Sequence, residues 1–228
     1  MSGLAPLLRK ELLEQWRTMR LPIVGFTAFW LIREFSGLQN LIGAHPYFEW
    51  DMRFQLGVIA RVTLLLLLLC FAILHLVRRQ PIRKLPGWRP QIDALLGLTT
   101  AYFALLLPRP AATPLWDGLS ILFMLGGNLF CIFAALDLGR SLSIMPEARR
   151  LVTHGIYSVI RHPLYLGETI AFFGVFLQIR SWPAFAIMAL QLFFQIRRMI
   201  WEETVLATAF AKYGEYRQKT WRLIPGFY

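Results

Sequence analysis

Long apolar runs constrain this chain more than any other feature of its sequence. The clearest covers residues 56–77 and contains six consecutive leucines at 64–69. Because a helix needs about 20 mostly apolar residues to cross a bilayer, this run predicts a membrane-spanning helix. Similar runs occupy residues 92–107, 115–138, 164–179 and 183–196. We therefore expect an all-α fold, a polytopic membrane helical bundle.

The number of spans depends on the first apolar run, residues 21–32. Its 12 residues are too few to cross a bilayer unless they borrow residues 16–20, and a re-entrant segment is the alternative. Five and six transmembrane helices both remain open. Residues 1–20 place basic side chains among leucines at helical spacing and lack the features of a signal peptide, so they predict an uncleaved amphipathic helix at the inner interface.

Composition and charge agree with a membrane protein. The chain is 57% apolar and 16% charged, against about 45–50% and about 25% in typical soluble domains. Its net charge of +11 is one-sided, because 19 of the 24 basic residues fall in the N-terminus, the C-terminus and two loops that share one side of the predicted bundle. The positive-inside rule makes that side cytoplasmic, in the inner membrane if the chain is bacterial. We expect no nucleic-acid partner.

One arginine and two cysteines inside the apolar runs can have either a functional or a purely structural role. Arg61 is a functional candidate by its place in a membrane helix, although it lies near the outer end and can snorkel. Cys70 and Cys131 have no CxxC or histidine partner nearby, so we interpret them as small core residues and expect no metal site.

Any chemistry is expected at the cytoplasmic face, because the outer connections are short. No dinucleotide, P-loop, GxSxG or HExxH motif occurs. Two polar segments, residues 140–167 and 197–228, each adjoin a membrane helix and can place side chains at the hydrocarbon boundary.

In the first segment, Pro163 disfavours a helical conformation at His162, so a helix is expected to begin there. Basic and aromatic side chains then surround a helix N-terminus, whose N–H groups favour an anionic ligand. These side chains are Arg161, His162 and Tyr165, with Arg149 and Arg150 brought back by a turn at Gly155. A belt of Arg and Tyr that anchors lipid headgroups would explain the same residues.

In the second segment, Glu202 and Glu203 are costly near a membrane helix end unless they are partnered or solvated. Arg198 shares a face with Glu202. Opposite a basic, aromatic pocket, these carboxylates would complement a ligand that carries a carboxylate and cationic groups, as S-adenosylmethionine does. Whether Arg198 and Glu202 pair with each other or both face ligands stays open, and we favour the ligands.

The chain resembles the family of membrane methyltransferases that contains isoprenylcysteine carboxyl methyltransferase and phospholipid methyltransferases. The resemblance covers about residues 138–225. It depends on the string Gly-x-Tyr-x-x-x-Arg-His-Pro-x-Tyr-x-Gly at 155–167, and on Glu-Glu-x-x-Leu at 202–206 followed by an aromatic stretch and Leu-Ile-Pro at 223–225. It implies S-adenosylmethionine as cofactor, S-adenosylhomocysteine as product, and a methyltransferase core in residues 138–228 behind N-terminal membrane helices in residues 1–137.

The resemblance also implies roles for particular residues. Its positions that line or hold the cofactor are Arg149, Arg150, Leu151, Val152, Tyr157, His162, Pro163, Leu164, Tyr165 and Glu202; Arg161 and Glu203 join them from the patterns above. Arg198 matches a position that faces substrate and is our candidate catalytic residue.

The acceptor is expected to be amphipathic or lipidated and to enter from the bilayer. We favour a carboxylate such as that of an isoprenylcysteine, which needs orientation by Arg198 but no base. A phospholipid amine or a thiol would instead need deprotonation, for which His162 or Glu203 is available. Rival interpretations are an NADPH-dependent membrane reductase of the sterol-reductase type, whose C-terminal region resembles this family, and a non-enzymatic scaffold or transporter.

Overall fold

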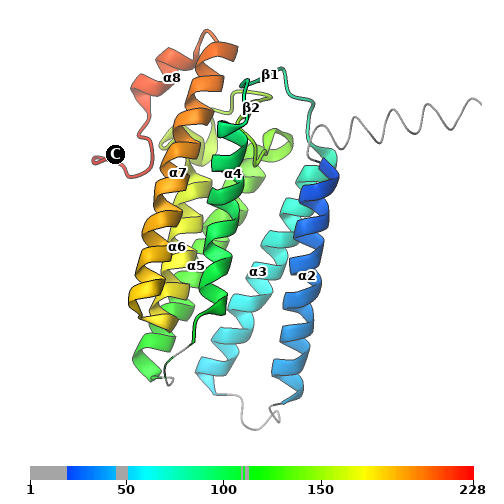
Figure 1. The fold of residues 1–228 in the computed structure, drawn as a ribbon, viewed down its shortest axis with the longest axis vertical. Coiled ribbons are helices and arrows are strands. Elements are labelled where there is room, and N and C mark those ends of the chain that lie inside the picture. The colour runs from blue at the N-terminus through cyan, green and yellow to red at the C-terminus, as the bar shows by residue number, and fades with distance from the viewer. Residues whose placement is uncertain (1–19, 45–50, 109, 111–112) are drawn as a thin grey trace, which may run out of the picture.

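The computed structural model describes residues 20–44, 51–108, 110 and 113–228. Within them the chain passes six times along the long axis of the molecule (Figure 1). The passes are α2 (Arg20–Gly43), α3 (Met52–Val77), α4 (Arg89–Thr99) continued by the 3₁₀-helix η2 (Thr100–Leu106), α5 (Pro114–Leu138), α6 (Pro163–Ile179) and α7 (Trp182–Ala209). The predicted all-α class is confirmed. Two strands of two residues each, β1 (Arg83–Lys84) and β2 (Glu147–Ala148), pair antiparallel.

Four helices are long and apolar enough to span a membrane: Leu21–Gly43, Met52–Val77, Pro114–Ser141 and Trp182–Ala209. Helix α6 is apolar but shorter, at 17 residues. The first predicted run was too short because it ended at the polar pair Arg33–Glu34. In the structure α2 continues through this pair as one helix of 24 residues, so the segment is not re-entrant.

Two other predicted spans differ from the structure. The run at 92–107 is not one α-helix, because the chain changes to a 3₁₀-helix at Thr100. The run at 183–196 ended too early, since α7 extends to Ala209. Its polar turn is tolerated because the charges have partners: Arg197 Nε donates to Asp93 Oδ2 at 2.9 Å, and Trp201 Nε1 donates to the same oxygen at 2.7 Å.

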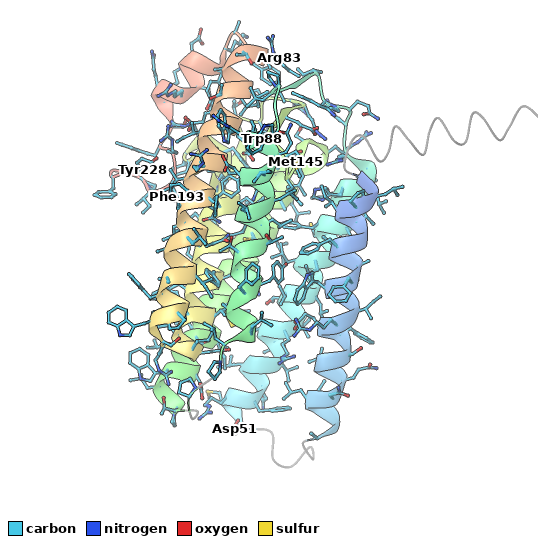
Figure 2. All side chains as sticks on the ribbon, in the orientation of Figure 1. Asp51, Arg83, Trp88, Met145, Phe193 and Tyr228 are labelled. Carbon is cyan, nitrogen blue, oxygen red and sulfur yellow. The ribbon has the colours of Figure 1, made fainter. Side chains whose placement is uncertain are left out.

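The two ends of the bundle differ in what they carry. Asp51 lies at one end, whereas Arg83, Trp88 and Met145 lie toward the other (Figure 2). The latter end also carries the β1–β2 pair and α8 (Tyr213–Lys219), and we call it the basic end (Figure 1). Residue 20 begins α2 at this end as well. The predicted amphipathic helix over residues 1–20 lies almost wholly outside the described residues.

Close packing between α5 and α6 fixes the position of the α6 N-terminus. A Cβ added at Gly127 would lie 2.4 Å from the Ala171 amide nitrogen, and one added at Gly167 would lie 2.6 Å from the Cys131 sulfur. Small residues therefore let the two backbones approach each other, as is common between membrane helices. Cys131 is buried in this contact as a free thiol, which confirms its interpretation as a core residue, and the free Cys70 is partly buried against the same core.

Candidate active site

A cavity at the basic end collects most of the predicted site residues. Its walls come from the loop after α5, the 3₁₀-helix η4 (Gly155–Ser158), the start of α6, the end of α7, and α8. Ten predicted residues line it: Arg149, Arg150, Leu151, Val152, Tyr157, Arg161, His162, Leu164, Tyr165 and Glu202. Pro163, Glu203 and Arg198 are absent from this lining.

The loop that carries Arg149 to Tyr157 is held at two points. The Glu147 carboxylate contacts Lys84 Nζ at 3.1 Å and Arg149 Nη2 at 2.6 Å, so it joins the loop to β1. At the other point, the amide of Ile156 donates to Asp137 Oδ2 at 2.9 Å. Gly155 makes this turn possible, because its φ is +58° and a Cβ there would lie 2.0 Å from the same carboxylate. The predicted turn at Gly155 is thus confirmed.

The start of α6 is covered by the C-terminal segment. Pro163 lies in the first turn and His162 is the N-cap, as predicted. The amides of Arg161 and His162 donate to the carbonyl oxygens of Trp221 and Arg222, at 2.8 and 3.1 Å. These two amides, which precede the first turn of α6, are therefore already used within the chain.

Glu203 forms an internal ionic cluster. Its carboxylate accepts hydrogen bonds from Arg161 Nε at 3.0 Å and from Arg222 Nε and Nη2 at 2.9 and 2.8 Å, and it lies 3.3 Å from His162 Nε2. The paired side chains are mostly buried: that of Glu203 is 7% exposed and that of Arg222 is 19% exposed. Glu203 therefore ties α7 to the α6 N-terminus and to the C-terminal segment.

Glu202 faces the other way, into the cavity. It accepts a hydrogen bond from the Tyr165 hydroxyl, and its Oε2 lies 3.8 Å from His162 Nδ1. The adjacent carboxylates thus have different surroundings: Glu203 is surrounded by the chain's own cations, whereas Glu202 contacts neutral or weakly basic groups at the cavity wall.

Arg198 is buried directly behind the cavity wall. Its guanidinium lies over the Tyr165 ring, 4.7 Å from the centroid, and its Nε donates to the Ile144 carbonyl at 3.2 Å. Within the described residues it forms no ion pair with Glu202, and its buried Nη1 has no hydrogen-bond partner. The internal ion pair considered from the sequence is therefore not what the structure contains.

Two tyrosines of the C-terminal segment complete the cavity. Tyr216 donates from its hydroxyl to the Tyr157 carbonyl at 2.8 Å, and burial raises the pKa of this phenol to about 12. The Tyr213 hydroxyl is buried and has no partner among the described residues. Burial likewise raises the Tyr213 pKa, so both phenols are neutral donors near pH 7.

A polar cluster that the sequence did not predict lies deeper between α6 and α7. Gln195 Nε2 donates to Glu168 Oε2 at 3.1 Å, and the Thr169 hydroxyl donates to Gln195 Oε1 at 2.9 Å. The helical spacing could have revealed it, because Glu168 lies three residues after Tyr165 and Gln195 three residues before Arg198. The cluster therefore extends the polar side of the site into the bundle.

A comparison with known protein families finds a match in this part of the chain. A sequence model of the phospholipid methyltransferase family matches residues 118–213, which run from α5 to the start of α8 and contain all but one of the cavity-lining residues. No curated protein matches the chain. Members of this family use S-adenosylmethionine, and the unpartnered Tyr213 hydroxyl, the Glu202 carboxylate and the exposed Arg150 suit the polar groups of such a ligand. Residues 118–213, somewhat less than half of the chain, are therefore similar to the phospholipid methyltransferase family of membrane methyltransferases.

Proposed function

We propose that the cavity at the basic end binds S-adenosylmethionine and that the chain methylates an amphipathic acceptor beside it. The observation that carries this proposal is the convergence of ten predicted residues, from two membrane helices and a loop, on one cavity. Arg150 is the candidate partner of the methionine carboxylate. Glu202 is the candidate partner of the ammonium group or a ribose hydroxyl, and the apolar side chains of Val152, Val205 and Leu206 offer a surface for adenine.

The cofactor, when bound, supplies an electrophilic methyl group on a sulfonium. The chain's own contribution is to align the acceptor with that methyl group and to exclude water. The Tyr165–Glu202 hydrogen bond and the Glu203 cluster hold the α6 and α7 ends in register, so the cavity wall is preorganised.

For the acceptor we propose a carboxylate, as in an isoprenylcysteine. The supporting observation is the buried Nη1 of Arg198, a charged donor without a partner in the described part of the chain. A carboxylate would satisfy this donor and needs no general base, because it is already ionised near pH 7.

An amine acceptor, such as a phospholipid headgroup, is the second candidate. Glu168 favours it, because this carboxylate lies within the bundle near Arg198 and is oriented by Gln195. An ammonium group would be attracted to Glu168 and must lose a proton before attack, and a buried carboxylate can take that proton.

We also propose that the basic end is cytoplasmic, because the positive-inside rule assigns the arginine-rich loops to that side. The acceptor would then reach the cavity sideways from the inner leaflet, with its apolar part among the helices.

The test is methylation of a lipid extract by the purified protein with S-[methyl-³H]adenosylmethionine. Label released as methanol by mild base indicates a carboxyl ester, whereas base-stable label in a lipid amine selects the second candidate, and label on sulfur contradicts both. Arg198→Gln should abolish ester formation, and Glu168→Gln should leave it largely intact; the reverse pattern favours the amine. Arg197→Gln is the matched control, because Arg197 pairs with Asp93 outside the cavity.

A further inference from the structure

A second hollow lies in the half of the bundle nearer Asp51. It is bounded by α2, α3, η2, α5 and α6 and shares no lining residue with the cavity at the basic end. Its walls are largely apolar, with Ile121, Met124 and Phe172 among them, yet Arg61 of α3 and Glu34 of α2 face each other across it. We call it the α2–α3 groove. The lining also includes the charged residues Arg33, Asp51, Arg53 and Asp117. A groove with both apolar walls and charged side chains suits an amphipathic ligand.

Arg61 has unused hydrogen-bonding capacity. Its Nη1 lies 3.8 Å from Glu34 Oε2, well beyond the roughly 2.7–2.9 Å of a charge-assisted hydrogen bond. Arg53 and Asp117 of the same groove, by contrast, are 2.9 Å apart. Gly37 leaves space beside the guanidinium, since a Cβ there would lie 3.0 Å from Nη1. Arg61 therefore reaches across to α2, and its guanidinium can accept a second anionic partner.

Trp30 supplies another donor to the groove. Its indole Nε1 is buried and has no acceptor among the described residues. The ring is held by stacking on Tyr102, with centroids 4.2 Å apart. Trp30 lies one helical turn before Glu34, so its N–H and the Arg61 guanidinium belong to the same stretch of the groove.

We propose that the α2–α3 groove binds the phosphate of a membrane phospholipid through Arg61 and Trp30, with the acyl chains along its apolar walls. Arg61 lies nine residues into α3, which is about 14 Å from the helix start. A ligand that brings its own apolar part reaches this depth more readily than a free ion. The proposal is independent of the methyl-transfer function, because the groove lies in the other half of the bundle.

The experiment is native mass spectrometry of the detergent-purified protein with added dioleoylphosphatidylglycerol, dioleoylglycerol or inorganic phosphate. We expect the phospholipid to be retained and the other two to be retained poorly. Arg61→Gln and Trp30→Phe should each weaken phospholipid retention, by about tenfold for the arginine. Glu34→Gln should strengthen it, because it removes the competing carboxylate.

Matched controls lie at the same end of the bundle but outside the groove. Arg180→Gln and Trp182→Phe should leave retention unchanged. Equal retention of phospholipid and dioleoylglycerol would overturn the proposal, as would parallel effects of Arg61→Gln and Glu34→Gln, which indicate a purely structural ion pair. Retention of inorganic phosphate as strong as that of the lipid would also overturn it. If Arg61→Gln fails to fold, Trp30→Phe alone decides, because it keeps the aromatic ring.

Discussion

Glu202 and Glu203 are neighbours in sequence but should respond to the same substitution in opposite ways. Glu203→Gln removes the negative charge that holds Arg161 and Arg222, which are then left mostly buried without a counterion. Glu202→Gln keeps an acceptor for the Tyr165 hydroxyl and removes a charge at the cavity wall. We therefore expect the first variant to lose stability and the second to lose affinity for the methyl donor.

The contacts set the size of each effect. Removing one partner of a buried ion pair costs about 3–5 kcal/mol. Because the Arg222 side chain is 19% exposed, we expect about 2–4 kcal/mol for Glu203→Gln, which lowers the Tm of a chain this long by about 5–15 °C. Glu202→Gln should change stability by less than about 1.5 kcal/mol, and loss of a charge-assisted hydrogen bond should weaken donor binding about 10- to 100-fold.

The assay pairs thermal unfolding in detergent with calorimetric titration of S-adenosylmethionine on the same preparations. Glu215→Gln is the control, because Glu215 is an exposed residue of α8 away from this cavity. A Glu203→Gln protein that matches wild type in Tm but loses donor binding would contradict this prediction, because Glu203 would then bind the ligand rather than link α7 to the α6 N-terminus.

Two further predictions concern packing and pH. In the same unfolding assay, Gly127→Ala should destabilise the bundle by about 1–3 kcal/mol, because the added Cβ would meet the Ala171 backbone. Gly126→Ala is the control: the space around Gly126 is open, so this variant should be neutral or slightly stabilising. The Tyr216 pKa is raised from 10.0 to about 12 in the fold, so the folded state holds this proton more tightly than the unfolded state. Its contribution to stability is full below pH 10 and declines toward pH 12, and Tyr216→Phe should flatten that part of an alkaline unfolding profile.

The sequence predicts the local turns around the candidate site better than it predicts the ends of the membrane helices. Glycine and proline constrain the backbone at their own positions, so the sequence alone predicts a turn at Gly155 and a helix start at Pro163. The structure confirms both. The ends of α2 and α7 depend on partners elsewhere in the chain. Arg197 can lie within a long apolar helix because Asp93 comes from α4, and hydropathy along one segment carries no information on that pairing.

The charged residues show the same limit. Their type and spacing indicate a polar site, but not which charges the chain itself neutralises. Glu147 forms an ion pair with Arg149. Glu203 forms ion pairs with Arg161 and with Arg222, a residue that the sequence analysis did not assign to the site. Arg150 is exposed at the cavity, and the buried Nη1 of Arg198 has no hydrogen-bond partner in the described structure. The domain boundary at residue 138 and the individual ligand roles stay predictions.

Equilibrium binding of S-adenosylmethionine to the purified protein in detergent, with NADPH measured in parallel, tests whether the basic end holds a methyl-donor site. A methyl-donor site at the basic end predicts saturable binding of S-adenosylmethionine at one site per chain, loss of that binding in Glu202→Ala and His162→Ala, and no comparable binding of NADPH. No donor binding by folded wild-type protein, donor binding unchanged in both variants, or preferential binding of NADPH would contradict it.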